Sequence, residues 1–277
     1  MLDPSNPRLK PALTSGTPVG VIWFTLGHIP LIEIACRHDP DAIVVDMQHG
    51  LFDRLSLEAA IGISSAPVMV RTRDDHPASI GEALDAGAEG IIVPLVESGA
   101  AAHAVARACR YPPDGNRSGG GIRPLADFAG HIANANGAIV AGVMIETAAG
   151  VEAAEEIARS GIDFVFIGTG DLSLSLGAAP GSREHEAACQ TILAACRKAG
   201  IPCGAFAMDA AGGTARAAQG FALSVSAIDS EIYEKGMAAA LGEFGAGTAA
   251  TTTRQARAAR RGRAAAPAGT SRPRRRR

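Results

Sequence analysis

The chain has 277 residues, of which 47% are hydrophobic, 19% are charged and 4% are aromatic. This composition excludes an intrinsically disordered protein and argues against a base-stacking nucleic-acid surface. The net charge of −2 is the sum of two unlike parts. Residues 245–277 contain ten arginines and no acidic residue, a net charge of +10. Residues 1–244 therefore hold 16 basic and 28 acidic side chains, a net charge of −12.

Eight short apolar runs recur along the chain, and several are continuously apolar, as buried parallel strands are. In chain order they are 19–26, 42–45, 68–70, 90–93, 139–145, 164–167, 203–207 and 222–225. Segments with helical spacing lie between them, at 55–63, 80–86, 100–109, 151–158, 185–199, 210–218 and 231–241. We expect left-handed caps at the glycines that precede the next strand, which are Gly87, Gly137, Gly161, Gly200 and Gly220.

This alternation predicts an α/β fold, a single-domain (β/α)₈ TIM barrel. A doubly wound open sheet is the alternative, although no GxGxxG motif follows the first run. The turn-rich segment Tyr111–Arg123 predicts a long loop. We assign residues 1–15 to an N-terminal extension, 16–244 to the barrel and 245–277 to a disordered, Arg-rich tail.

Neither targeting nor disulfide signals are evident. The first ten residues carry charges and two prolines instead of the apolar run of a signal peptide. No apolar stretch approaches the ~20 residues that span a bilayer. The five cysteines form no CxxC pair, which favours buried reduced thiols over a zinc site. We therefore expect a cytoplasmic protein with no membrane contact.

Polar side chains follow four neighbouring strands, at the barrel end where chemistry is expected. Asp46 and His49 follow the second run, Arg71 the third, Glu146 the fifth and Asp171 the sixth. The fourth run ends in Pro94, to which we assign no chemistry. A histidine, an arginine and carboxylates are thus predicted to share one rim.

Glu146 and Asp171 form a carboxylate pair of the kind that binds a hard divalent cation such as Mg²⁺ or Mn²⁺. Each could instead cap the helix that follows, and Asp171 has the character of an N-cap. The presence of His49 and Arg71 at the same rim favours the metal site.

His49 suits a general base near neutral pH, with a carboxylate to orient it. Asp46 and Asp85 are both candidates for that carboxylate, and spacing does not choose between them. Arg71 ends a buried run and so must meet an anion, either a carboxylate or a developing enolate oxygen. We treat the remaining histidines as solvated or structural, namely His28, His38, His76, His103, His131 and His185.

At these positions the chain resembles the HpcH/HpaI family of class II pyruvate aldolases, whose type member is 4-hydroxy-2-oxo-heptane-1,7-dioate aldolase. The similar stretches are VVDMQHG (44–50), VMVR (68–71), LDAGAEGIIVPLV (84–96), RYPPDGNR (110–117), VMIET (143–147) and FIGTGDLSLSLG (166–177). They follow the family's order and cover roughly residues 15–243.

The resemblance implies a metal-dependent lyase on a (β/α)₈ barrel, assembled as a hexamer. By matching position, Glu146 and Asp171 would hold the metal, Mg²⁺ or Mn²⁺, with Co²⁺ and Zn²⁺ as alternatives. His49 would be a base acting through a water, with Asp85 raising its basicity. Arg71 would stabilise the enolate oxygen, and the backbone N–H of Gly170 and the Asp171 region would lie against the pyruvate carboxylate.

Three departures from the family pattern concern the substrate. Gln48 stands where the family commonly has Glu, and Met144 stands where the type member has Gln. Thr169-Gly170 replaces the more usual Pro-Ala. The metal, base and arginine positions are kept, so carbon–carbon bond chemistry is expected while the particular substrate stays open.

The expected function is a class II aldolase that cleaves or forms 4-hydroxy-2-oxo acids, to or from pyruvate or a related 2-oxo acid and an aldehyde, through a metal-stabilised enolate. A Schiff-base mechanism is disfavoured because none of the three lysines, Lys10, Lys198 and Lys235, ends a strand. The alternatives are a CoA-thioester lyase of the citryl/malyl type, a polyanion-binding protein acting through the basic tail, and a non-catalytic binding barrel.

Overall fold

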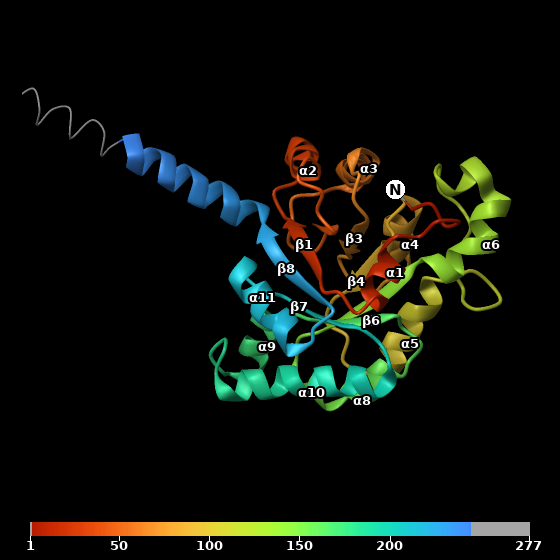
Figure 1. Ribbon diagram of the computed structural model, residues 1–277. Helices are drawn as coiled ribbons and strands as arrows, with labels where there is room; N and C mark the ends of the chain where they lie inside the picture. Colours follow the sequence, from red (N-terminus) through yellow and green to blue (C-terminus); the bar gives the residue numbers. More distant parts are fainter. Residues whose placement is uncertain (1, 245–277) are drawn as a thin grey trace, which may run out of the picture. The chain divides into compact units, whose positions relative to one another are not determined.

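The computed structural model describes residues 2–244, and its eight parallel strands close into a barrel in chain order (Figure 1). The strands are β1 (Val19–Phe24), β2 (Ala42–Asp46), β3 (Val68–Arg71), β4 (Gly90–Val93), β5 (Val140–Ile145), β6 (Phe164–Ile167), β7 (Cys203–Ala205) and β8 (Leu223–Ile228). The predicted (β/α)₈ barrel is confirmed. The open-sheet alternative is wrong, because β1 pairs with β8.

Helices connect the strands and surround the barrel (Figure 1). They are α1 (Leu9–Thr14), α2 (Ile29–Cys36), α3 (Arg54–Ile63), α4 (Pro77–Asp85), α5 (Gly99–Ala108), η1 (Pro124–Asp127), α6 (Phe128–Ala138), α7 (Ala148–Glu152), α8 (Ala154–Ala158), α9 (Thr169–Leu176), α10 (Arg183–Ala199) and α11 (Ala210–Gln219). Four of the five predicted cap glycines have positive φ; Gly137 does not, because it lies inside α6.

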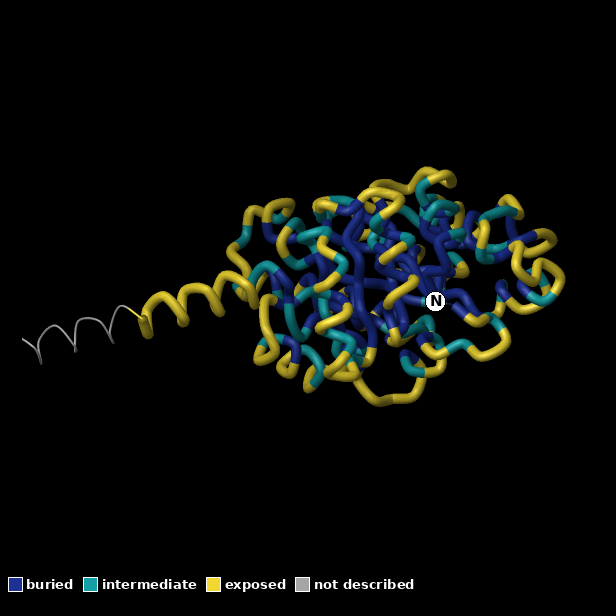
Figure 2. The backbone as a smooth tube through the Cα atoms, turned by 90° about the horizontal axis from the view of Figure 1, so that it is seen from above, coloured by how far each residue is buried: buried dark blue, intermediate teal, exposed yellow. Residues whose placement is uncertain are grey.

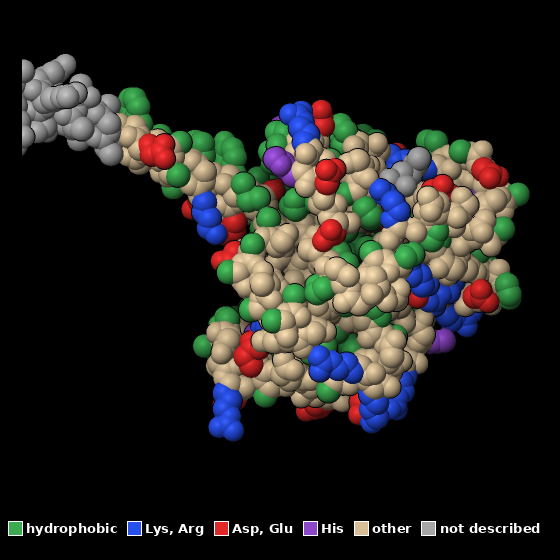
Figure 3. Space-filling model, in the orientation of Figure 1, with side chains coloured by type: hydrophobic (Ala, Val, Ile, Leu, Met, Phe, Trp, Pro, Cys, Tyr) green, Lys and Arg blue, Asp and Glu red, His purple; other side chains and the backbone are tan. Residues whose placement is uncertain are grey.

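Residues 231–244 are the described part of a second unit, and we describe them by themselves. Residues 231–244 are helical, and all from 232 onward are exposed (Figure 2). Hydrophobic side chains are visible on the surface of this helix (Figure 3). The predicted basic tail, 245–277, lies outside the described residues. Within residues 2–244, no helix is long and apolar enough to cross a membrane.

Two apolar layers hold the barrel. One fills its interior with side chains that alternate along the strands, and the other lies between the strands and the helices. Because most of the strands are buried on both faces, they read as continuous apolar runs. Inside the barrel, small and large residues complement each other: the Phe164 ring occupies the space that a side chain on Gly142 would need.

Helix α1 packs its Leu9 and Leu13 side chains into the interior layer at the amino-terminal end of the strands. Glu89, which immediately precedes β4 and is 2% exposed, anchors this helix. Its carboxylate accepts the backbone N–H groups of Arg8 and Leu9, each at 3.1 Å, and Arg8 Nη2 at 3.0 Å. Helix α1, held by Glu89, thus closes the amino-terminal end of the barrel, opposite the mouth.

We predict that Glu89→Ala lowers the free energy of unfolding by about 2–3 kcal/mol, because it leaves the buried Leu9 N–H and the partly buried Arg8 N–H without an acceptor. Chemical denaturation measures this loss. Glu33→Ala, which removes an exposed i,i+4 pair with Arg37, is the control and should change stability by less than about 0.5 kcal/mol. Equal effects of the two substitutions would contradict the anchoring role of Glu89.

Candidate active site

The alternation of side chains along each strand carries three polar residues into the carboxyl-end mouth of the barrel. Val44, Met69 and Met144 belong to the interior layer. Residues two positions further along a strand point to the same side. Asp46, Arg71 and Glu146 stand at those positions, so the interior face becomes polar where the strands end.

Asp46 and Arg71 are bound to each other across β2 and β3, where they are direct register partners. Arg71 Nε donates to Asp46 Oδ1 at 2.9 Å, and Nη2 donates to Oδ2 at 2.5 Å. Trp23 lies beneath, with its indole N–H 3.3 Å from Asp46 Oδ2 and its ring centroid 5.1 Å from the Arg71 guanidinium carbon. The expectation that Arg71 meets an anion is met by a carboxylate of the protein itself.

The environment of Asp46 keeps this carboxylate ionised. Burial, the largest influence, raises its pKa, but the hydrogen bonds and charge of Arg71 outweigh it. The backbone N–H of His49 and the Trp23 indole add to this stabilisation, and the pKa of Asp46 lies below its usual value. Asp46 therefore acts as a fixed negative charge.

His49 lies in the turn that follows β2, with an exposed side chain. Asp46 Oδ1 accepts the backbone N–H groups of Gln48 (3.0 Å) and His49 (3.2 Å). The structure thus brings Asp46 and His49 together through the main chain, and it is the turn that Asp46 orients. No hydrogen bond joins the His49 ring to Asp46 in residues 2–244.

Glu146 is the most exceptional carboxylate of the mouth. It is 1% exposed, its Oε1 accepts the backbone N–H of Leu95 at 2.8 Å, and its Oε2 has no partner among the described residues. Burial raises the pKa of Glu146 to about 7; the Leu95 N–H partly offsets this and the neighbouring Asp171 carboxylate adds to it. A buried acceptor without a donor is energetically costly, so a cation that binds there gives the largest stabilisation.

Leu95 is a residue of the site that the sequence reasoning missed, since no chemistry was assigned to the end of the fourth run. Its φ of +57° is unusual for a bulky residue, and its side chain is 56% exposed. This conformation aims its N–H at Glu146. No sequence signal marks it, because left-handed backbone normally favours glycine or asparagine.

Asp171 lies in the first turn of α9, half-buried, next to the exposed Gly170. Helix α9 begins after Gly168 and has no side-chain cap. A side chain on Gly168 would collide with Glu146 Oε2, so glycine lets the carboxylate approach this helix end. Glu146, Asp171 and the first backbone amides of α9 therefore share one corner of the mouth, where the helix dipole favours an anion.

Asp85 lies elsewhere. It ends α4, which carries the chain back from the mouth to the amino-terminal end of the barrel. There it pairs with the buried Arg117 at 2.8 Å, and both line a cavity of about 530 Å³. The structure does not bring Asp85 to His49 within one chain.

The donor set at the mouth fits a hard divalent cation. Glu146 Oε2 is buried without a partner, and Asp171 offers a second carboxylate beside it. Oxygen donors of this kind suit Mg²⁺ or Mn²⁺. A second group that could ligate a metal, His185, Glu186 and Cys189 in α10, also lies within the described chain.

We predict that Glu146→Gln stabilises the metal-free protein above pH 7. A carboxyl group whose pKa is about 7 in the folded protein and has its ordinary value of 4.5 in the unfolded chain binds more protons in the folded state. Its contribution to stability is therefore lost as pH rises from about 4.5 to 7, by about 3 kcal/mol. Gln keeps the acceptor for Leu95 and removes the titration.

Denaturation of both proteins from pH 4 to 8 measures this difference, with the exposed Glu152→Gln as control. The gap between Glu146→Gln and the parent protein should grow with pH. A gap independent of pH would show that Glu146 is not the desolvated carboxylate described here.

The chain matches a known protein family. The profile of the HpcH/HpaI aldolase/citrate lyase family matches residues 20–234. The chain is 36% identical over 237 residues to a hydroxypyruvate/pyruvate aldolase from Rhizorhabdus wittichii, covering 80% of this chain and 92% of the relative. It is 35% identical over 206 residues to a 4-hydroxy-2-oxovalerate aldolase from Rhodococcus jostii, and this match covers 72% of this chain and 79% of the relative.

Among solved structures, the fold is similar to that of an HpcH/HpaI aldolase/citrate lyase family protein from Burkholderia cenocepacia J2315. The TM-score is 0.82 at 28% sequence identity, and the match covers 86% of this chain and 99% of that protein. The chain therefore belongs to the HpcH/HpaI aldolase/citrate lyase family.

Proposed function

We propose that the chain is a divalent-metal-dependent aldolase that interconverts a 4-hydroxy-2-oxo acid with pyruvate, or a related 2-oxo acid, and an aldehyde. The observation that carries this proposal is the buried, unpartnered Oε2 of Glu146 beside Asp171, in the same mouth as Arg71. Relatives named for hydroxypyruvate, pyruvate and 4-hydroxy-2-oxovalerate support a free 2-oxo acid as substrate.

Glu146 and Asp171 hold the cation in this proposal, and it supplies positive charge for the oxygens of the 2-oxo acid when bound. The backbone N–H groups at Gly170 and Asp171, at an uncapped helix start, face the substrate carboxylate. The N–H donors of this helix end and the guanidinium of Arg71 then orient the acid between them.

Arg71 stabilises the charge that develops on the keto oxygen as the C3–C4 bond breaks. Asp46 engages its Nε and Nη2, which fixes the plane of the guanidinium and turns the remaining Nη1 edge toward the substrate. A rigid cation already in place needs no reorganisation during the reaction.

His49 accepts the 4-hydroxyl proton through a water and returns it in the reverse direction. Its exposed ring can reach a substrate in the mouth, while the Asp46 hydrogen bond fixes its backbone. Asp85 acts on His49 only if another copy of the chain supplies it, because α4 places it at the other end of its own barrel.

We also propose that the chain forms a homo-oligomer, a hexamer as the resemblance implies. Four large apolar side chains on helix 231–244 recur at helical spacing and are exposed: Tyr233, Met237, Leu241 and Phe244. An apolar stripe of this kind on a helix is typical of a surface buried by assembly.

We predict that the purified protein releases pyruvate from 4-hydroxy-2-oxo acids and that EDTA abolishes this activity. Mg²⁺, Mn²⁺ or Co²⁺ should restore it, because the carboxylate pair then regains its charge partner. Full activity after rigorous metal removal would contradict the proposal. Activity confined to CoA thioesters would favour the citryl/malyl lyase alternative.

A chain lacking residues 245–277 is the matched control for the basic tail. Its aldolase activity should equal that of the full chain, since the proposed site residues all lie before residue 172. If polyanion binding were the function of the protein, it should disappear with this deletion.

We predict that Arg71→Lys lowers kcat by about 10²–10³-fold, because lysine keeps the charge beside Asp46 but loses the planar fork. Steady-state kinetics at saturating substrate measure this. Arg73→Lys, at an exposed arginine two residues along the chain, is the control. An unchanged kcat would limit Arg71 to pairing with Asp46.

A further inference from the structure

We propose that His185 is a positioning residue that fixes the first turn of α9, and thereby Asp171, for cation binding. This inference rests on the proposed function of the mouth. His185 lies outside the mouth, in the first turn of α10, and its side chain is 1% exposed. It reaches α9 through the main chain of Thr169.

Both ring nitrogens of His185 have backbone partners. The N–H of Gly181 donates to Nδ1 at 3.3 Å, while Glu186 Oε1 lies 3.6 Å from the same nitrogen, beyond hydrogen-bond distance. Nδ1 is therefore the acceptor for Gly181 and carries no proton. Nε2 therefore carries the proton and donates it to the Thr169 carbonyl, 2.9 Å away. Only the neutral ring with its proton on Nε2 makes both bonds, and it links the start of α9 to the turn that leads into α10.

Thr169 is held from a second direction, toward the barrel interior. Its hydroxyl donates to the Phe206 carbonyl at 3.3 Å, and the Phe206 ring packs edge-on against Trp23 with centroids 5.3 Å apart. Trp23 in turn donates to Asp46. Thr169, the first residue of α9, is thus fixed between α10 and the Phe206–Trp23 aromatic pair, and Asp171 follows two residues later.

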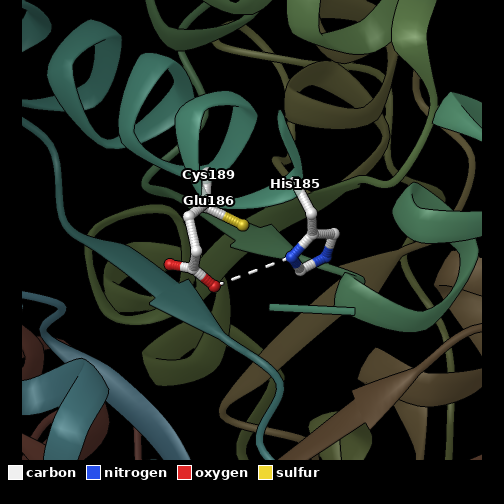
Figure 4. Close-up of side chains that lie close together, drawn as sticks. All are labelled: His185, Glu186 and Cys189. Carbon is white, nitrogen blue, oxygen red and sulfur yellow. Dashed lines mark ion pairs between the residues drawn. The ribbon is translucent and has the colours of Figure 1, made fainter. Parts of the chain in front are cut away.

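The neighbours of His185 argue against a metal site in α10. His185, Glu186 and Cys189 lie together (Figure 4), but Glu186 is held in two hydrogen bonds by Arg216, at 2.6 and 2.7 Å. Burial raises the pKa of the Cys189 thiol to about 11, so it keeps its proton near neutrality. A cation here would face the Arg216 guanidinium and displace the Gly181 hydrogen bond.

The hydrogen bond to Thr169 matters for cation affinity because outer partners orient the residues that ligate a metal. Loss of such a partner typically costs 10–100-fold in metal affinity. Asp171 is in the same helical turn as Thr169, so a loosened turn separates its carboxylate from Glu146. The bond to Gly181 fixes a surface turn and should matter for folding stability alone.

Two substitutions separate these bonds. His185→Gln places an amide N–H near the position of Nε2 and can keep the bond to Thr169, whereas His185→Asn places its amide oxygen near Nδ1 and keeps only the bond from Gly181. Titration calorimetry of the metal-stripped full-length proteins with Mn²⁺ gives the dissociation constant, and thermal melting gives Tm. His103→Asn, at an exposed histidine in α5, is the control.

We expect Mn²⁺ affinity to fall about 10–100-fold in His185→Asn and to stay within about threefold of the parent in His185→Gln, whatever the two Tm values. Parental affinity in both variants, or equal losses in both, would overturn the positioning role. The same role would be overturned by a Mn²⁺ site that is lost in the His185 variants but persists in Glu146→Gln, since the α10 group would then bind the metal. Failure of Glu146→Gln to weaken Mn²⁺ binding would refute the proposed function as well, whereas a failed His185 result with weakened binding in Glu146→Gln refutes the positioning role alone.

Discussion

The buried ion pair between Asp46 and Arg71 is the interaction on which the barrel mouth depends. Register across β2 and β3 sets the two residues side by side, and each charge would be costly to bury without the other. The Trp23 indole donates a hydrogen bond to Asp46, and the turn that carries His49 is held by a backbone N–H that donates to the same carboxylate. The position of the His49 turn, which carries the proposed base, and the orientation of the guanidinium therefore follow from one interaction.

Glu146 has the opposite environment in the same mouth. Burial raises the pKa of both carboxyl groups. At Asp46 this is outweighed by Arg71, the His49 N–H and the Trp23 indole, whereas the pKa of Glu146 rises to about 7 and one of its oxygens has no donor. One carboxylate is structural and permanently charged; the other gains from any cation that reaches it. This contrast separates the arginine side of the mouth from the proposed metal side, and in the proposed reaction a 2-oxo acid would meet a positive charge on each side.

The sequence predicted most of the strand positions, because most strands are buried on both faces and read as apolar runs. It also placed Asp46, Arg71, Glu146 and Asp171 at one rim, since parallel strands end together. It could not choose between Asp46 and Asp85 as the carboxylate partner of His49; in the structure Asp46 accepts the main-chain N–H of His49 and pairs with Arg71. It assigned no chemistry to the end of β4, where the backbone N–H of Leu95 donates to Glu146. Leu95 has a left-handed backbone conformation, which a leucine in the sequence does not predict.

By itself, the sequence determined the barrel, the family resemblance and the residue types at the mouth, because these depend on local periodicity and strand order. Tertiary structure decided which of those residues touch. Asp85 belongs with Arg117 at the far end of the barrel, and His185, one of six histidines without a distinguishing motif, became a link to the start of α9. Such pairings depend on strand register and on where helices return the chain, distances that no spacing along the sequence encodes.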